Sequence, residues 1–371
     1  MTMGVGQQVW ERFGHNAIGI RDARTGTDQV YNYGVFSFQE KGFLLHFVRG
    51  RMMYRLESWD AESTVAAYMR VGRSVWVQEL NFTPAQRVAL RDFLEWNARP
   101  ENKFYRYDYY LDNCSTRVRD ALDRILGGVI QGQTEHQPAG TTFRAHTLRL
   151  TANSLPIWTG LLLAEGHPVD RPISQWQEMF LPLALRERLR NITVTGEDGR
   201  PAPLVSAEQT IFDSGDNVPD HAPRWWPGFL AVGLVLGGAL AGSAARGRRG
   251  IFTGVSVVWL ALTGLSSLVL LGLWLLTDHT ITTHNENVLQ MTPLALALAV
   301  LLPRGLRTGR GLVRLLALGI AGLSLLGLAL KPFPGFSQAN LTAIALLLPI
   351  NLGLAYGVLK LMRGRQTPSP R

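Results

Sequence analysis

The chain has 371 residues, 46% of them hydrophobic, and a formal net charge of +9 at neutral pH. This length is sufficient for two domains. The single cysteine excludes an intramolecular disulfide. The basic excess does not indicate a nucleic-acid partner, because much of it lies in arginines beside apolar stretches. Arginine at such positions fixes the orientation of membrane helices.

Residues 1–222 are mixed in polarity and predict an α+β domain. Strand pairs are expected at 16–23 with 29–37 and at 43–48 with 52–56, each pair around a short turn. Residues 59–69 have helical spacing, and 74–80 alternate like a strand. Thr83, Pro84 and Gln86 mark a helix start before 87–98. Residues 105–110 are expected to be extended, and 114–126 to be helical.

Residues 223–371 predict an all-α transmembrane domain of about five helices. The expected spans are 226–245, 251–277, 288–302, 313–330 and 341–362. With five spans, the Arg-rich segments 246–249, 304–314 and 363–371 all fall on one side. The positive-inside rule then places the C-terminus in the cytoplasm and the N-terminal domain outside it, although a miscounted span would reverse this.

No export signal is visible before the domain-like pattern begins. We expect either that the true start lies upstream of Met1 or that export relies on the downstream helices.

The segment YDYYLDNCSTRVRD, residues 107–120, is the strongest candidate for chemistry. Asp112 and Asn113 are good N-cap residues, so a helix should begin at or near Cys114. The positive end of the helix dipole and the free N–H groups there favour a thiolate, and the same N–H groups could hold an oxyanion. The alternative is a buried, inert cysteine.

A thiol nucleophile needs a base, and the best candidate is His15 in RFGHNAIGI. His46 lies within an apolar run and is expected to be a packed strand residue. Asn32, on the strand expected to pair with the one after His15, could orient the imidazole, as could Tyr33 or Tyr107.

These motifs together resemble a known family. FGHNAI, VYNYGVFSF, FVRGRMMYRL and YDYYLDNCSTRVRD are similar to segments of the Lnb-type lipoprotein N-acyltransferases. The resemblance implies a permuted papain-like, NlpC/P60-like extracytoplasmic domain in which the histidine precedes the cysteine. Supporting roles are then expected for Tyr107, Asp108, Asn113 and Arg117. The stretch TDHTITTHNENVLQMTPL resembles an outside-facing loop, where His284 and Asn287 would hold a head group or position the acceptor; a plain polar turn is the alternative.

The resemblance also implies a reaction at the bacterial inner membrane. An acyl chain would pass from a phospholipid to Cys114, and then to the α-amino group of a diacylglyceryl-cysteine lipoprotein. No cofactor or metal is expected. An apolar surface must receive the acyl chain, and residues 105–110, Trp158 and 176–180 could supply it. Two other functions stay open: a membrane-tethered cysteine peptidase or amidase acting on cell-wall peptide, and a non-catalytic membrane scaffold.

Overall fold

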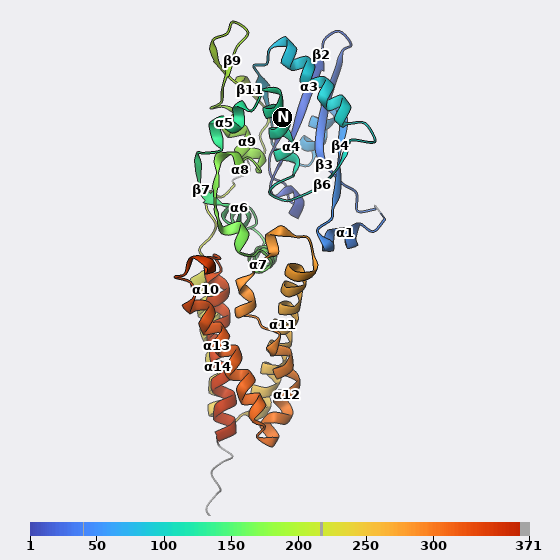
Figure 1. Ribbon diagram of the computed structural model, residues 1–371. Helices are drawn as coiled ribbons and strands as arrows, with labels where there is room; N and C mark the ends of the chain where they lie inside the picture. The colour runs from blue at the N-terminus through green and yellow to red at the C-terminus, as the bar shows by residue number, and fades with distance from the viewer. Residues whose placement is uncertain (40, 216–217, 364–371) are drawn as a thin grey trace, which may run out of the picture. The chain divides into compact units, whose positions relative to one another are not determined.

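The computed structural model describes residues 1–39, 41–215 and 218–363, which form two compact units (Figure 1). The first unit contains Met1–Ile157 and Arg171–Ala222. The second contains Trp158–Asp170 together with the chain from Pro223 onward. The domain boundary expected from the sequence assigned 158–170 to the first domain, but the structure packs this segment within the second unit. Residues 364–371, part of the last Arg-rich segment, lie outside the described residues.

The first unit is built on a seven-stranded antiparallel sheet with the order β11-β5-β1-β2-β3-β4-β6. Its strands are β1 (Thr2–Met3), β2 (His15–Asp22), β3 (Thr27–Val35), β4 (Met53–Asp60), β5 (Val75–Leu80), β6 (Phe104–Arg106) and β11 (Val205–Phe212). The predicted pairing of β2 with β3 is confirmed, and its register places Ala17 opposite Asn32. The α+β class expected from the sequence is correct.

Helices cover both faces of this sheet. On one face α3 (Pro84–Asn97) and α4 (Cys114–Ile125) bury Leu94 and Leu122 against Tyr33 and Leu56. On the other face α2 (Ala61–Arg70) packs Tyr68 over a smaller cluster that includes Ala17. Full burial of one aliphatic side chain stabilises a fold by roughly 1.5–3 kcal/mol, so the larger cluster fixes α4 firmly on β2 and β3.

The rest of the first unit consists of short elements. They are η1 (Val9–Glu11), α5 (Val129–Thr134), β7 (Pro138–Thr142), α6 (Phe143–Leu150), the start of α7 (Leu155–Ala164), β8 (Pro172–Ser174), α8 (Gln175–Glu178), α9 (Pro182–Leu189), β9 (Thr193–Thr195) and β10 (Pro201–Pro203).

Two predictions for this unit are wrong. Residues 43–48 form a helix, α1 (Phe43–Arg49), and not a strand. Its apolar residues are consecutive and do not alternate, and periodicity alone does not distinguish helix from strand in such a run. Left-handed Gly42 and Gly50 bound the helix on its two sides. In residues 105–110 the strand ends at Arg106, and a bridge between Asp108 and Asp112 closes a turn.

The second unit contains five helices long and apolar enough to cross a membrane within the described residues, as predicted. Four of these spans lie in α10 (Trp226–Ala245), α11 (Arg249–Leu276), α13 (Gly311–Ala329) and α14 (Leu341–Arg363). The remaining span, Thr280–Thr308, comprises the short turns η3 (Thr280–Thr282) and η4 (Glu286–Leu289) and the helix α12 (Leu294–Thr308). The unit also contains the short turns η2 (His167–Asp170) and η5 (Pro334–Phe336). α12 begins six residues later than predicted, because Asn285–Thr292 is a buried polar loop and not the start of a helix.

Helices α10 and α14 approach closely through glycine. A Cβ added at Gly237 would lie 2.3 Å from the Pro349 carbonyl oxygen, and one added at Gly353 would lie 2.1 Å from the Gly237 carbonyl oxygen. Small residues allow such backbone contact between helices in lipid, where packing replaces the hydrophobic effect as the force for association.

Candidate active site

Cys114 is the first residue of α4, as the sequence predicted. The Asn113 side chain caps the helix, because its Oδ1 accepts from the backbone N–H groups of Ser115 and Thr116, both at 2.9 Å. Its Nδ2 donates to the carbonyls of Tyr109 at 2.9 Å and Phe180 at 3.0 Å. Asn113 therefore positions the cysteine, and its own polar atoms are fully used in doing so.

Gly34 lets β3 approach the cysteine. Its φ of 85° lies in the left-handed region, and a Cβ built on it would stand 3.2 Å from the Cys114 Cβ. A side chain at this position would press on the thiol-bearing residue. The sequence analysis did not single out Gly34, although a glycine inside a strand pattern is a signal of close backbone approach.

His15 and Asn32 are joined by a hydrogen bond, with 3.2 Å between His15 Nε2 and Asn32 Oδ1. Asn32 is fully buried, and its Nδ2 donates to the Val30 carbonyl at 2.9 Å, which fixes the orientation of the amide. Asn32 Oδ1 is therefore the acceptor, and His15 Nε2 carries the proton. The Nδ1 atom of His15 is left as the basic nitrogen.

The imidazole is neutral at neutral pH. Burial lowers the pKa of His15 to about 4, and the hydrogen bond to Asn32 opposes this only in part. A neutral imidazole with a fixed tautomer is the form that a general base requires.

The thiol lies against the segment of β2 that carries His15. The backbone N–H groups of Asn16, the next residue in β2, of Ser115 and of Cys114 itself lie near the Cys114 sulfur and favour its charged form. All three lower the pKa of Cys114, in the predicted direction, but burial has the larger effect and leaves the pKa raised above its ordinary value. The resting cysteine is therefore a thiol and not the expected thiolate.

Among the described residues no direct hydrogen bond joins Cys114 to His15. Catalytic hydrogen bonds often tighten only in the substrate complex.

Two residues that the sequence analysis missed lie around His15. The Tyr68 ring stacks on His15 with 6.2 Å between centroids and 13° between planes. Arg73 is buried, lies 4.8 Å over the Tyr68 ring, and forms an ion pair with Glu11. Its charge lowers the pKa of both His15 and Cys114. Neither residue belongs to a recognisable motif, because α2 and the turn after it reach the site only through the fold.

The other predicted residues of this segment have positioning roles. Asp108 Oδ1 accepts from the N–H groups of Tyr110 and Leu111, both at 3.0 Å, and so holds the turn before the helix. Arg117 forms a bidentate ion pair with Asp112, and its guanidinium lies 4.2 Å over a tyrosine ring of β6. Tyr107 is half-buried among aromatic rings, and desolvation first and the nearby Cys114 second raise its pKa well above the ordinary value.

His284 and Asn287 belong to the second unit and hold its own structure together. Asn287 is fully buried, and its Nδ2 donates to the carbonyls of Leu162 at 3.3 Å and Leu163 at 3.1 Å. The His284 carbonyl accepts from the His167 N–H at 3.3 Å, and its ring is tilted on Trp274. This loop thus anchors 158–170, and the Asn287 amide is committed to that contact.

The apolar residues expected to receive an acyl chain are mostly internal. Trp158 is buried in the second unit against Trp225 and Phe229, and Phe180 is buried in the first. The described residues contain no group of three or more His, Cys, Asp or Glu side chains placed to hold a metal ion.

Residues 1–153 match the family model of the Lnb N-terminal periplasmic domain. This part of the chain belongs to the Lnb family. The matched region of the Lnb domain includes Cys114, His15 and Asn32, and five candidate membrane spans follow it, as in an Lnb-type protein. The chain is therefore a membrane protein whose N-terminal domain is periplasmic. No curated protein and no solved structure matches it significantly.

Proposed function

We propose that this protein is a lipoprotein N-acyltransferase of the bacterial inner membrane, with its C-terminus in the cytoplasm. It takes an acyl chain from a phospholipid onto Cys114 and passes it to the α-amino group of a diacylated lipoprotein. The observation that carries the proposal is the Cys114, His15 and Asn32 group beside an exposed apolar hollow.

The hollow lies on α1 and the end of β3. It has a volume of about 900 Å³, and its lining includes Phe36, Phe38, Phe43, Leu44, Leu45 and Tyr54. Among the described residues, no charged side chain lines it. Leu44 is 72% exposed, and α1 has no buried residue. An exposed apolar surface of this kind indicates a lipid or protein ligand. Because the periplasmic domain belongs to a chain with membrane spans, membrane lipid is an available ligand.

Aromatic rings connect the hollow with the thiol. Tyr54 in its wall stacks on Phe36 at 4.9 Å and on Tyr107 at 4.2 Å between centroids. Tyr107 lies close enough to Cys114 for the charge on the cysteine to affect its pKa. An acyl chain in the hollow would have its ester end near the sulfur, whereas a peptidase that binds cell-wall peptide needs a polar groove.

In the first step His15 Nδ1 takes the proton from the Cys114 thiol as the sulfur attacks the ester carbonyl. The N–H groups near the sulfur, those of Asn16 and Cys114, would stabilise the oxyanion. The carbon–oxygen ester bond then breaks, and His15 returns the proton to the departing lysophospholipid alcohol. The product is an acyl thioester on Cys114.

In the second step the lipoprotein amine attacks the thioester carbonyl and His15 takes a proton from it. The carbon–sulfur bond breaks, and the proton passes to the sulfur to restore the thiol. Asn32 keeps the imidazole in the required tautomer during both steps. A neutral histidine serves both steps, because each begins with proton removal from the nucleophile.

The test uses bacteria depleted of their own lipoprotein N-acyltransferase. Expression of the full chain should restore growth, and mass spectrometry should find an amide-linked acyl chain on the lipoprotein N-terminus. Cys114→Ala and His15→Ala should fail, while His136→Ala, at an exposed histidine, should succeed. Rescue by Cys114→Ala would contradict the proposal. Failure of the wild type, with Cys114-dependent cleavage of cell-wall peptide, would establish the peptidase alternative instead.

A further inference from the structure

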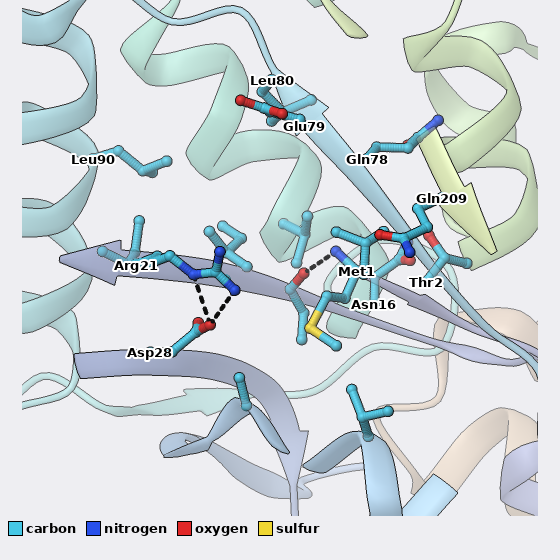
Figure 2. A pocket seen from close by; sticks show the side chains of 18 of the residues that line it. Met1, Thr2, Asn16, Arg21, Asp28, Gln78, Glu79, Leu80, Leu90 and Gln209 are labelled. Atoms are coloured by element: carbon cyan, nitrogen blue, oxygen red, sulfur yellow. Dashed lines mark hydrogen bonds and ion pairs between the residues drawn. The ribbon is translucent and has the colours of Figure 1, made fainter. Parts of the chain in front are cut away.

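The first unit has an opening in the middle of its sheet. β1 contains only Thr2 and Met3, yet it is the strand between β2 and β5. It pairs Thr2 with Asn16 on one side and with Trp76 on the other. Since neighbouring strands lie about 4.8 Å apart, β1 holds β2 and β5 about two spacings apart. Beyond Met1 the two strands part, with no described strand between them (Figure 2).

A cavity lies between β2 and β5 beyond Met1. Its volume is about 1510 Å³, and it is lined on one side by Ile18–Asp22 of β2 and on the other by Val77–Leu80 of β5. Figure 2 shows Arg21 on the β2 side of this space, with its guanidinium turned to Asp28, and Gln78, Glu79 and Leu80 on the β5 side. Backbone N–H and C=O groups at the edges of a sheet are a template for an added strand.

The N-terminal amino group marks where such a strand enters. The Met1 nitrogen donates to the Ala17 carbonyl at 2.9 Å, and the Ala17 nitrogen donates back to the Met1 carbonyl at 3.1 Å. This reciprocal pair continues the β1–β2 ladder one residue beyond Thr2. Burial lowers the pKa of this amino group to about 6. A peptide N–H would donate the same bond without burying an ionisable amino group in the sheet.

We propose that this gap is filled by the residues that precede Met1 in a longer form of the chain, which extend β1 between β2 and β5. The strand register determines which face of the sheet each added side chain points to. The residue directly before Met1 pairs with Ile18, and the third before it pairs with Ile20. Ile18 is buried in the core under α4 and Ile20 packs against that core, so both new residues are apolar. The residue between them pairs with Gly19 and faces α2, where Val65 and Met69 line the cavity.

This extension also supports the candidate site. β2 carries His15, and the structure pairs β2 on its β1 side only through residues 15–17. With the added strand, β2 would be held on both edges along most of its length.

The test compares full-length chains in detergent, each released from a cleavable tag so that its first residue is defined. One begins with Val-Thr-Val before Met1, one with Thr-Val-Thr, one with Gly-Ser-Gly, and one at Met1. Val-Thr-Val should slow amide exchange in Ile18–Ile20 and Val77–Leu80 at least tenfold and raise the melting temperature. The other two extensions should not, since they place a polar residue or glycine on the core side.

Equal exchange and stability in the Val-Thr-Val and Gly-Ser-Gly chains would overturn the proposal. The proposal would also be overturned if an added strand peptide slowed amide exchange in the chain that begins at Met1 while the Val-Thr-Val extension had no effect. The occupant of the gap would then be a separate partner. An independent check is the N-terminal peptide of the protein purified from its own cells. It should begin upstream of Met1, and a mature N-terminus at Met1 would contradict the inference.

Discussion

Gly34 offers a direct way to disturb the thiol without removing any functional group. Gly34→Ala adds one methyl group at φ 85°, and this carbon would lie 3.2 Å from the Cys114 Cβ. Left-handed backbone costs a non-glycine residue about 1–2 kcal/mol, which predicts a matching loss of unfolding free energy. Relief of the contact moves Cys114 by a few tenths of an ångström. Displacement of a nucleophile by 1 Å can cost about 100-fold in rate, so we expect acylation to slow about tenfold.

Gly26→Ala is the matched control. Gly26 has a φ of 68°, and an added Cβ there meets no atom within 4 Å. Both variants should lose similar stability in thermal unfolding, because both place alanine in left-handed backbone. Only Gly34→Ala should slow single-turnover acylation of Cys114 by a defined phospholipid, measured by intact mass. Equal acylation rates in the two folded variants would refute the claim that β3 sets the position of the thiol.

Further predictions address the other parts of the site. Asn32→Ala should lower the acylation rate about 10- to 100-fold, and Asn32→Asp should shift the acid limb of the pH–rate profile upward, because a carboxylate raises the histidine pKa. The pKa of His15 is about 4 in the folded protein and 6.5 in the unfolded chain. As pH falls, the unfolded chain therefore binds the proton first, and the free energy of unfolding should decrease from pH 6.5 to pH 4. Denaturant titrations should show a weaker fall in His15→Gln. Leu44→Ser should weaken binding of the full chain to phospholipid vesicles, whereas Val71→Ser, at a similarly exposed position, should not. Asn287→Ala should destabilise the second unit by about 1–3 kcal/mol in thermal scans, because it removes buried hydrogen bonds to the Leu162 carbonyl and to the Asn340 side chain.

The features that the sequence predicted well depend on local pattern. The spans follow from long apolar runs, and the start of α4 follows from Asn113 as an N-cap. The β2–β3 pairing followed from two strand-like runs around a turn, which brought His15 and Asn32 together. In each case residues near one another in the chain carry the information.

The features that were missed depend on contacts distant in sequence. Arg73 and Tyr68 reach His15 only because α2 crosses the sheet. The raised pKa of Cys114 reflects burial, which no local motif reports. Residues 158–170 pack with the membrane unit through Asn285 and Asn287. The side-chain amides of these two residues donate to backbone carbonyls in the last turn of α7. A two-residue strand such as β1 carries no periodicity at all.

The central claim is that Cys114 carries the acyl chain. The most direct measurement is intact-protein and peptide mass spectrometry of the full chain in detergent after incubation with a phospholipid of defined acyl composition and no acceptor. The account predicts a mass increase of one acyl chain on the peptide that contains Cys114, removed by hydroxylamine at neutral pH, absent in Cys114→Ala and strongly reduced in His15→Ala. Lipoprotein acylation that proceeds without any hydroxylamine-sensitive adduct on Cys114, or in Cys114→Ala, would contradict it.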